Sequence, residues 1–402
     1  MKIEHLSAVF RKKFGRALPL LVGLALTLCV IYGAYLIIIP KTVSCFSYDE
    51  IPSYLGATFE ETSSLSCGKL VDVKSGQYKL FGTIPIKSVT VSKLADTKVH
   101  LGGVPFGIKF LTEGASVVGF ENEAENPAFK AGLRLYDTII KVNGKAFSTS
   151  HELARVAESG SEIELCVLRA GKELKIKFKP TYSENEKKHT LGIWLKDSGA
   201  GIGTVTFVLP DGTFGGLGHG ICESNTGELT KITNGCVLDV TVNGIIKGQS
   251  GAPGELKGYF NSSKVGAIYK NTEVGVFGAF TQIPDSIKEK SYSIGLKNEL
   301  KEGKATLVCT LSDNERREYS IEISNINRSA TGNKCFSIKV TDEKLLAQTG
   351  GIVQGMSGSP IIQNGKLVGA VTHVMINDPT VGYGIFIENM LTQLAESHQS
   401  AA

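Results

Sequence analysis

The longest apolar stretch of the chain lies close to its start. Residues 17–39 contain 23 positions without a charged side chain. At about 1.5 Å per residue a helix of this length spans roughly 35 Å, enough to cross the hydrocarbon core of a bilayer. Five basic residues precede it, and the core is longer than that of a cleaved signal peptide. The pattern predicts a single-pass transmembrane anchor, with residues 1–16 in the cytoplasm and everything after Pro40 outside.

Short alternating runs and glycine turns replace helical periodicity beyond the anchor. Residues 40–95 are expected to form a stalk or a small β region. Residues 96–180 form a compact pattern of short strands with helices at Pro127–Leu133 and Ser150–Ala157. A polar linker at 181–190 follows. Residues 191–395 are rich in short apolar strands, and their length fits one double β-barrel, with a tail at 396–402. The expected fold is therefore mainly β.

The segment Gly355–Pro360 contains the first candidate for chemistry, Ser357. It reads Gly-Met-Ser-Gly-Ser-Pro and precedes two apolar runs joined by Asn364-Gly365, a hairpin signal. Small residues on both sides leave the Ser357 Oγ exposed, and trypsin-like serine peptidases place their nucleophile in this context. There the N–H groups of Gly355 and Ser357 would face a developing oxyanion. The alternative is a glycine-rich turn with a solvent-exposed serine.

A nucleophilic serine needs a base, and His219 is the best candidate among seven histidines. It lies between two glycines after an apolar run at 203–209, so its side chain can face a cleft. A histidine in a glycine-rich loop can also be merely structural. His373 follows the hairpin on an apolar strand and is interpreted as a packed strand residue.

Ser250 lies in a second stretch of small residues, Gly248–Pro253. It follows His219 by only 31 residues. In a two-barrel peptidase the base belongs to the first barrel and the nucleophile to the second, so Ser250 is too early and is interpreted as structural.

The residue that would orient His219 is less well defined. Four aspartates lie between the base and the nucleophile, and Asp342 is selected by its position at the end of an alternating strand before Ser357. An equally good interpretation makes Asp342 the N-cap of a short helix at Glu343–Ala347.

Composition narrows the choice of partners and cofactors. Lys and Arg number 43 against 39 Asp and Glu, a small excess that gives no sign of a nucleic-acid surface. Eight cysteines occur without CxxC spacing. We therefore expect no metal site and no cofactor. Two disulfide pairings, Cys45–Cys67 and Cys222–Cys236, remain open.

Residues 96–180 resemble a PDZ domain in the order of their glycine loop, strands and short helices. Such domains hold an extended peptide or a free C-terminus by strand addition. The resemblance implies that the backbone at Phe106, Gly107 and Ile108 receives the peptide. The alternative is a PDZ fold that serves only as a spacer.

The order of anchor, PDZ domain, Gly-His-Gly and Gly-Met-Ser-Gly-Ser-Pro resembles the stage IV sporulation protein B family of signalling serine peptidases. Residues 197–204 and 253–256 add to the likeness. The resemblance implies His219, Asp342 and Ser357 as the catalytic residues. It also implies cleavage of a regulator of a membrane protease in the forespore intermembrane space, which triggers activation of the late mother-cell sigma factor. A membrane-tethered peptide-binding protein with an inactive protease fold is the other interpretation.

Overall fold

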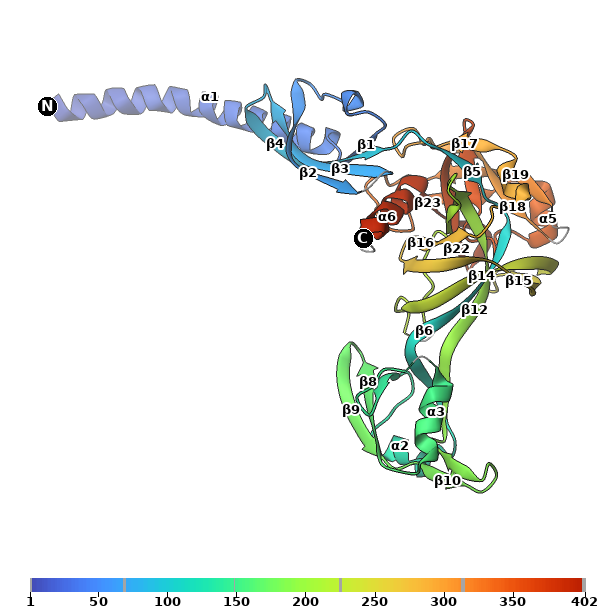
Figure 1. The fold of residues 1–402 in the computed structure, drawn as a ribbon. Coiled ribbons are helices and arrows are strands. Elements are labelled where there is room, and N and C mark those ends of the chain that lie inside the picture. Colours follow the sequence, from blue (N-terminus) through green and yellow to red (C-terminus); the bar gives the residue numbers. More distant parts are fainter. Residues whose placement is uncertain (1, 68–69, 148, 224–225, 312–314, 400–402) are drawn as a thin grey trace. The chain divides into compact units, whose positions relative to one another are not determined.

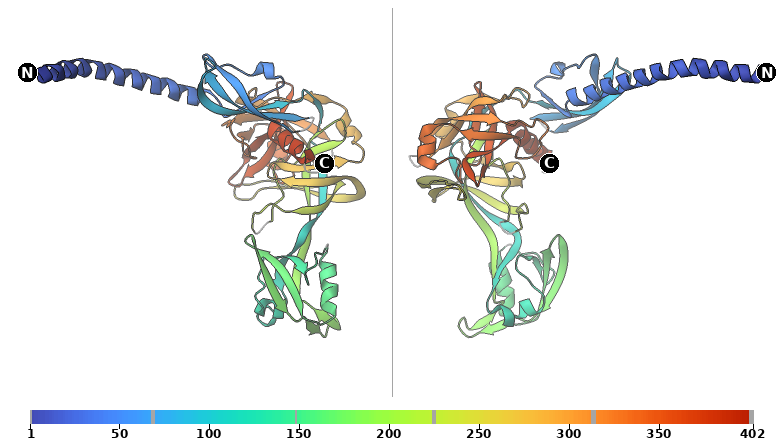
Figure 2. Two further views of the ribbon diagram at one scale, coloured as in Figure 1. Left: turned by 60° about the vertical axis from the view of Figure 1, so that its left-hand side comes forward. Right: turned by 180° about the vertical axis from the view of Figure 1, so that it is seen from behind.

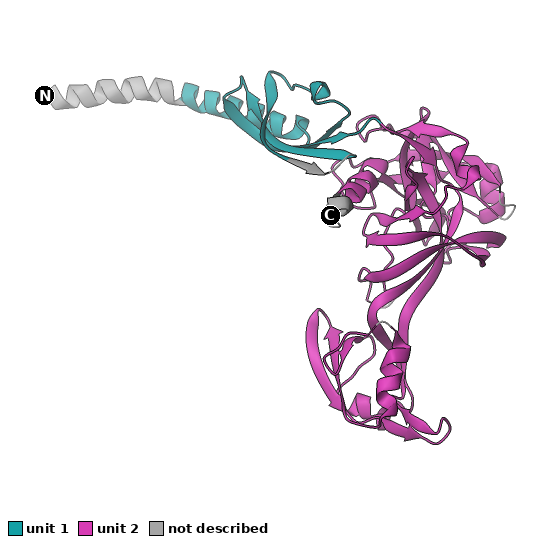
Figure 3. Ribbon diagram, viewed as in Figure 1, with its two compact units in different colours: residues 1–96, 398–402 teal, residues 97–397 magenta. Residues whose placement is uncertain are grey.

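The computed structural model describes residues 2–67, 70–147, 149–223, 226–311 and 315–399 (Figure 1). The side chains of residues 2–18, 65–67 and 396–399 are outside this description. The chain divides into two compact units, residues 1–96 with 398–402 and residues 97–397 (Figure 3).

The first unit begins with the long helix α1, Lys2–Ile38. Within it the segment Pro19–Ile38 has a mean hydropathy of 2.4, so it is long and apolar enough to cross a membrane. A signal sequence near an N-terminus has the same length and composition. A small sheet follows, in the order β1-β4-β3-β2. Its core contains Ile39, Val43, Tyr78 and Val91. Its elements are β1 (Thr42–Cys45), η1 (Tyr48–Glu50), β2 (Ala57–Cys67), β3 (Val71–Leu80) and β4 (Ile84–Leu94).

The second unit contains a first barrel of six strands. The sheet runs β12-β13-β16-β15-β14-β6, and pairing of β6 with β12 closes the ring. Phe106, Val205, Phe214 and Val276 are among the side chains of its core. The barrel strands and their neighbours are β5 (Lys98–Leu101), β6 (Pro105–Phe120), β12 (Ile193–Val208), β13 (Thr213–Gly216), β14 (Ile232–Ile246), β15 (Glu255–Thr272), β16 (Gly275–Phe280) and β17 (Ser291–Ser293).

The PDZ-like module is inserted into this barrel. The chain leaves the barrel along β6 and returns along β12, and the two strands pair over most of their length (Figure 2). Both ends of the module therefore lie within strands that it shares with the barrel. The inserted elements are η2 (Glu123–Glu125), α2 (Pro127–Lys130), β7 (Thr138–Val142), α3 (Ser150–Glu158), β8 (Ile163–Arg169), β9 (Lys172–Phe178), β10 (Thr181–Ser183) and β11 (Lys188–Thr190).

The second barrel is a closed ring in the order β18-β19-β20-β23-β22-β21. Along β19, Tyr319, Ile321 and Ile323 are buried at every second position, as expected for a strand with one face on a core. The elements of this part are α4 (Asp285–Lys288), β18 (Gly303–Thr310), β19 (Arg316–Ser324), β20 (Phe336–Val340), α5 (Glu343–Thr349), β21 (Pro360–Gln363), β22 (Lys366–Met375), β23 (Asp378–Phe386) and α6 (Ile387–Gln399).

The hairpin predicted after Ser357 is present. Strands β21 and β22 pair in antiparallel register. Asn364 and Gly365 have φ values of 53° and 76°, the left-handed pair that a tight hairpin turn requires.

Candidate active site

Ser357 and His219 line the same cavity, which has a volume of about 590 Å³. His219 follows β13 of the first barrel, and Ser357 precedes β21 of the second. Strand β12 also contributes to the wall through Ser198–Ile202. The structure thus brings together the two residues that the sequence singled out from positions far apart in the chain.

The loop that carries Ser357 is held in place by two threonines of β12. Thr204 donates from its N–H to the Ser357 carbonyl at 3.0 Å and from Oγ1 to the Gly355 carbonyl at 2.7 Å. Thr206 Oγ1 donates to the Gly358 carbonyl at 2.7 Å. Gly358 has φ 95°, and a Cβ there would run into the backbone at Thr204 and Leu217. These bonds and the close packing at Gly358 fix the position of the loop against the first barrel. The sequence analysis did not identify Thr204, which makes two of the three bonds.

Two N–H groups beside the nucleophile are available to an oxyanion. The Met356 N–H donates to the Val353 carbonyl at 3.1 Å, and the Gly358 N–H donates to the Val371 carbonyl at 2.8 Å. Within the described residues, the N–H groups of Gly355 and Ser357 have no such acceptor. These two N–H groups are therefore not engaged within the loop, as the donors of an oxyanion hole must not be.

His219 is held through its Nδ1, which lies 2.8 Å from the Gly220 carbonyl oxygen. A carbonyl only accepts, so Nδ1 carries the hydrogen and the neutral ring presents a lone pair at Nε2. Burial lowers the pKa of His219, and the bond to Gly220 opposes this in part. Burial thus favours the neutral ring, and the bond to Gly220 selects the tautomer that a general base requires.

The turn before His219 is strained. Leu217 and Gly218 have φ values of 65° and 68°, two left-handed residues in succession. A Cβ at Gly218 would crowd the Thr372 side chain at 2.9 Å. Left-handed conformations at non-glycine residues concentrate at functional sites, where the surrounding packing enforces them.

The Ser357 hydroxyl donates to the Thr372 carbonyl at 2.8 Å. In this structure it therefore lies in the same cavity as His219 without donating to it.

A second histidine lies against the candidate base. The rings of His219 and His373 have centroids 5.0 Å apart. The Nδ1 of His373 is buried without a hydrogen-bond partner in the described structure. Burial, His219 and Lys334 lower the pKa of His373 to about 4. The sequence interpretation of His373 as a packed strand residue missed this contact, because nothing local to β22 indicates it.

Asn271 fixes the segment that follows His219. Its Oδ1 accepts from the Ile221 N–H at 2.8 Å, and its Nδ2 donates to the carbonyls of Ile221 and Thr230 at 2.7 and 2.8 Å. It lies at the end of β15 and was not among the sequence candidates.

Asp342 does not orient His219. Its Oδ1 accepts from the N–H groups of Lys344 and Leu345 at 3.0 and 3.1 Å, and its Oδ2 accepts from Ser320 at 3.2 Å. These bonds make it the N-cap of α5. The prediction of Asp342 as a triad member is wrong for this structure, since its carboxylate caps a helix while His219 Nδ1 bonds to Gly220. The alternative interpretation as an N-cap is confirmed.

Ser250 lies outside the cavity. Ser250 lies in the turn between β14 and β15, and its hydroxyl donates to the carbonyl of Asn377 at 2.8 Å. It has no histidine partner among the described hydrogen bonds, in agreement with a structural role.

Among the cysteines, Cys222 lines the active-site cavity. Burial, Glu273 and Glu223 raise the pKa of its thiol. Cys222 and Cys236 are not joined in a disulfide. The other pairing considered, Cys45–Cys67, involves the side chain of Cys67, which lies outside the described residues. In the described part of the chain, no group of three potential ligands is placed to hold a metal ion.

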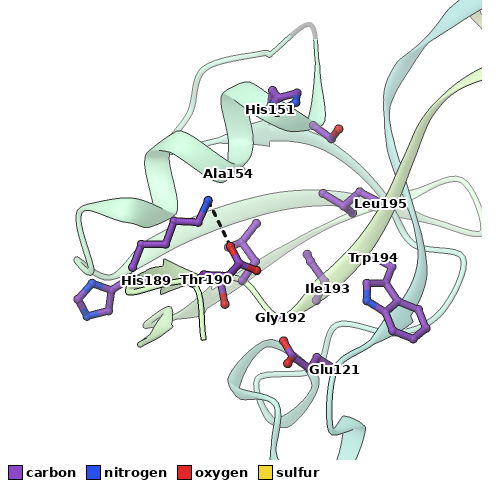
Figure 4. Close-up of a pocket in the computed structure, with 13 residues that line it drawn as sticks. Glu121, His151, Ala154, His189, Thr190, Gly192, Ile193, Trp194 and Leu195 are labelled. Atoms are coloured by element: carbon purple, nitrogen blue, oxygen red, sulfur yellow. Dashed lines mark ion pairs between the residues drawn. The ribbon is translucent and has the colours of Figure 1, made fainter. Parts of the chain in front are cut away.

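A second cavity, of about 320 Å³, lies in the inserted module (Figure 4). It lies between helix α3, which contributes His151 and Ala154, and the segment Leu191–Leu195. From Ile193 to Leu195 one edge of β12 pairs with β6, which leaves the other edge toward the groove. Asn126 donates to the carbonyls of Leu191 and Gly192 at 3.2 and 2.7 Å and fixes the turn before the strand.

The predicted peptide-binding segment at Phe106, Gly107 and Ile108 is wrong. Gly107 pairs with Ile202 of β12 on one side and with Leu238 of β14 on the other. The side chains of Phe106 and Ile108 are buried in the first barrel. No strand edge is free there, so the groove of the module lies at Leu191–Leu195 instead.

Comparison with known families agrees with this geometry. Residues 104–179 match the PDZ domain family. Residues 187–391, just over half of the chain, match the SpoIVB peptidase S55 family. The chain belongs to that family. This SpoIVB-type peptidase is a serine endopeptidase with a PDZ domain, and its family and domain order confirm the prediction made from the motifs.

Several solved structures are similar to parts of the chain. The PDZ domain of an SdrC-like protein from Listeria monocytogenes is 21% identical, over 21% of this chain and 87% of that one, with a TM-score of 0.19. The active form of the Rv3671c protease from M. tuberculosis is 15% identical, over 49% and 74%, with a TM-score of 0.29. The HtrA-type protease AlgW with a decapeptide is 11% identical, over 53% and 57%, with a TM-score of 0.30. No curated protein matches the chain.

Proposed function

We propose that this SpoIVB-type peptidase uses Ser357 as its nucleophile and His219 as its general base. The observation that supports the proposal is the bond from His219 Nδ1 to the Gly220 carbonyl, which leaves the Nε2 lone pair of a neutral ring free beside Ser357. The proposal requires the Ser357 hydroxyl to leave the Thr372 carbonyl and to donate to Nε2 instead.

The reaction then follows the order of acyl transfer. Ser357 Oγ attacks the scissile carbonyl while its proton passes to His219 Nε2. The N–H groups of Gly355 and Ser357 stabilise the oxyanion of the tetrahedral intermediate. The imidazolium returns the proton to the leaving amine, and a water molecule hydrolyses the acyl-enzyme by the same steps. The Gly220 carbonyl provides the orienting bond that a carboxylate provides in a Ser-His-Asp triad.

The cellular role that we propose is the one expected from the family. The peptidase cleaves a regulator of a membrane protease in the forespore intermembrane space and so triggers activation of the late mother-cell sigma factor. Helix α1 serves as a single-pass anchor with a cytoplasmic N-terminus. The apolar span and the basic residues before it support this placement.

The PDZ groove at Leu191–Leu195 recruits an extended peptide or a free C-terminus. The peptide adds as a strand to the edge of β12 that β6 leaves open, with helix α3 on its other side. This replaces the segment 106–108 as the recognition site.

A small fluorophosphonate probe tests the nucleophile. We expect it to label the purified wild-type protein at Ser357, and labelling and cleavage of denatured casein to be lost in Ser357→Ala. Loss of a triad serine costs about 10⁶ in turnover. The matched control is Ser250→Ala, which should keep both activities. A Ser250→Ala variant that is dead while Ser357→Ala is active would overturn the assignment.

A further inference from the structure

The small sheet of the first unit is built onto the last turns of helix α1. Tyr35 and Ile39 belong to the buried core of this sheet. Lys87 of β4 donates from Nζ to the Leu36 carbonyl at 2.6 Å, in the last turn of the helix. Removal of the helix would take two side chains out of that core. Helix and sheet are therefore parts of one folded body.

Two tyrosines of α1 show which level of the helix the sheet reaches. The Tyr32 hydroxyl donates to the Ile86 carbonyl at 3.2 Å, and the Tyr35 hydroxyl donates to the Leu55 carbonyl at 2.7 Å. Tyr32 lies six positions before Ile38, the end of the apolar span, which corresponds to about 9 Å of helix. Long side chains of a helix lean toward its N-terminus. This end of the sheet therefore lies beside the apolar span and not beyond it (Figure 1).

Three large apolar side chains are exposed at the same end of the sheet. Leu55, Phe81 and Ile84 are 74%, 78% and 56% exposed. Leu55 lies in the turn before β2, and Phe81 lies in the turn between β3 and β4. The two turns are neighbours, because the Phe81 N–H donates to the Gly56 carbonyl at 3.3 Å. We call Leu55, Phe81 and Ile84 the apolar tip.

The chain around the apolar tip carries no charge. Residues 51–59 and 80–86 contain no Asp, Glu, Lys or Arg. Two of the charged residues that flank these stretches, Glu60 and Lys79, form an ion pair with each other at 2.7 Å. The tip can therefore enter an apolar medium without the cost of desolvating an ionised side chain.

The two turns have an unusual sequence for turns that face water. Leu55 and Phe81 have φ values of 48° and 52°, and the glycine after each is also left-handed. Large apolar residues rarely adopt this conformation. Asparagine is favoured there, and Asn364 occupies such a position in the exposed turn before β22. Leucine and phenylalanine at two neighbouring turns therefore indicate an apolar environment for the tip.

We propose that the apolar tip inserts into the extracytoplasmic leaflet of the bilayer that α1 crosses. The occupant of this surface is lipid, because the tip lies beside an apolar span whose own side chains, such as Ile31 and Ile37, are exposed. Tyr32 is half-exposed at the same level, and tyrosine is enriched at membrane interfaces. The second contact would restrict rotation of the helix about its axis. This inference rests on α1 being the single-pass anchor proposed above.

Tryptophan fluorescence of the full-length protein in vesicles tests the insertion. Trp194→Phe removes the single tryptophan of the chain, and Ser357→Ala prevents self-cleavage. In this background Phe81→Trp reports on the tip, and Leu28→Trp reports on the middle of the apolar span. Ser64→Trp is the matched control, because Ser64 is exposed on β2 of the same sheet. The vesicles contain phosphatidylethanolamine and phosphatidylglycerol, with or without brominated acyl chains, which quench tryptophans that touch them.

Ser64 lies seven positions along β2 from its first residue, Ala57, or roughly 23 Å of strand. We therefore expect brominated lipid to quench Phe81→Trp and Leu28→Trp at least twofold and to leave Ser64→Trp nearly unchanged. Absence of quenching in Leu28→Trp would refute the anchor and, with it, the inserted tip.

Quenching of Leu28→Trp without quenching of Phe81→Trp would overturn the inserted tip alone. A blue-shifted emission of Phe81→Trp without quenching would show in addition that protein, and not lipid, covers the tip. Equal quenching of Phe81→Trp and Ser64→Trp would also overturn the proposal, because the sheet would then lie flat on the membrane.

A second set of variants removes the apolar tip and keeps the turns. Leu55→Asn with Phe81→Asn creates two Asn-Gly pairs, which such turns favour, so the sheet should fold as before. With Ile84→Trp as the reporter, we expect this double change to lower quenching by brominated lipid at least twofold. Leu55→Met with Phe81→Leu, which stays apolar, is the control and should keep it. Unchanged quenching in the asparagine variant, with an unchanged thermal unfolding midpoint, would overturn the proposal.

Discussion

The imidazole rings of His219 and His373 lie with their centroids 5.0 Å apart and their planes tilted by 39°. One ring comes from the first barrel and the other from β22 of the second. The contact therefore places an aromatic side chain of the second barrel against the candidate base. Two positive charges at this distance would repel, so the pair favours the neutral state of both rings.

The buried His373 should make stability depend on pH. Its pKa is about 4 in the folded protein against an ordinary value of 6.5, so the unfolded chain binds more protons between these pH values. The contribution of His373 to the free energy of unfolding is therefore fully present above pH 6.5 and is lost as the pH drops toward 4. In His373→Phe, which keeps an aromatic ring against His219, this loss should be smaller.

Urea denaturation at pH 4, 5, 6 and 7, with Ser357→Ala in both proteins to prevent self-cleavage, measures the difference. The carboxylates contribute equally to both curves, so the difference between the curves reports on His373 together with its coupling to His219. If the free energies of unfolding of the two proteins changed with pH in parallel, the pKa of His373 would not be lowered by folding.

Thr204 should govern the rate of the chemical step. Thr204→Val removes the hydroxyl that holds the Gly355 carbonyl and leaves the backbone bond to Ser357. Loss of one such hydrogen bond costs about 1–2 kcal/mol, so we expect kcat to fall roughly tenfold. Thr204→Ser keeps the hydroxyl and should stay close to wild type. Steady-state kinetics on casein check this, and equal rates in the two variants would exclude a positioning role.

Asp342 should matter for stability more than for catalysis. Asp342→Ala removes the cap of α5 and should lower the free energy of unfolding by about 1 kcal/mol. Asp342→Asn keeps a capping oxygen and should retain most activity. A triad aspartate would instead lose about 10⁴ in kcat on conversion to asparagine. A stable Asp342→Asn protein with a loss of that size would contradict the capping role.

The PDZ groove should serve signalling and not the chemistry. Ala154 is exposed on α3 and faces the groove, so Ala154→Trp should fill it without disturbing the core. We expect normal fluorophosphonate labelling and impaired signalling in a sporulating cell. Arg155→Trp, on the same helix but outside the groove, is the control. Normal signalling in Ala154→Trp would mean that the groove is idle.

Features that depend on neighbours in the chain were predictable from the sequence. The Asn364-Gly365 turn sets its own hairpin, and small residues around Ser357 permit the sharp loop before it. Asp342 likewise begins a helix, because its side chain accepts hydrogen bonds from the N–H groups of Lys344 and Leu345. Each of these structures is decided by local backbone geometry and hydrogen bonding, which residue type controls directly.

Long-range strand pairing decided what the sequence left open. From the sequence, Gly107 was predicted to lie on a strand with a free edge for a peptide. In the structure it pairs with Ile202 on one side and with Leu238 on the other, residues that follow it by 95 and 131 positions. The same pairing made β12 the common strand of barrel, groove and cavity, and it placed Thr204 under the nucleophile. Residue type specifies that a segment is a strand, but which strand lies beside it depends on the burial of side chains across the whole barrel, and only the folded chain determines that.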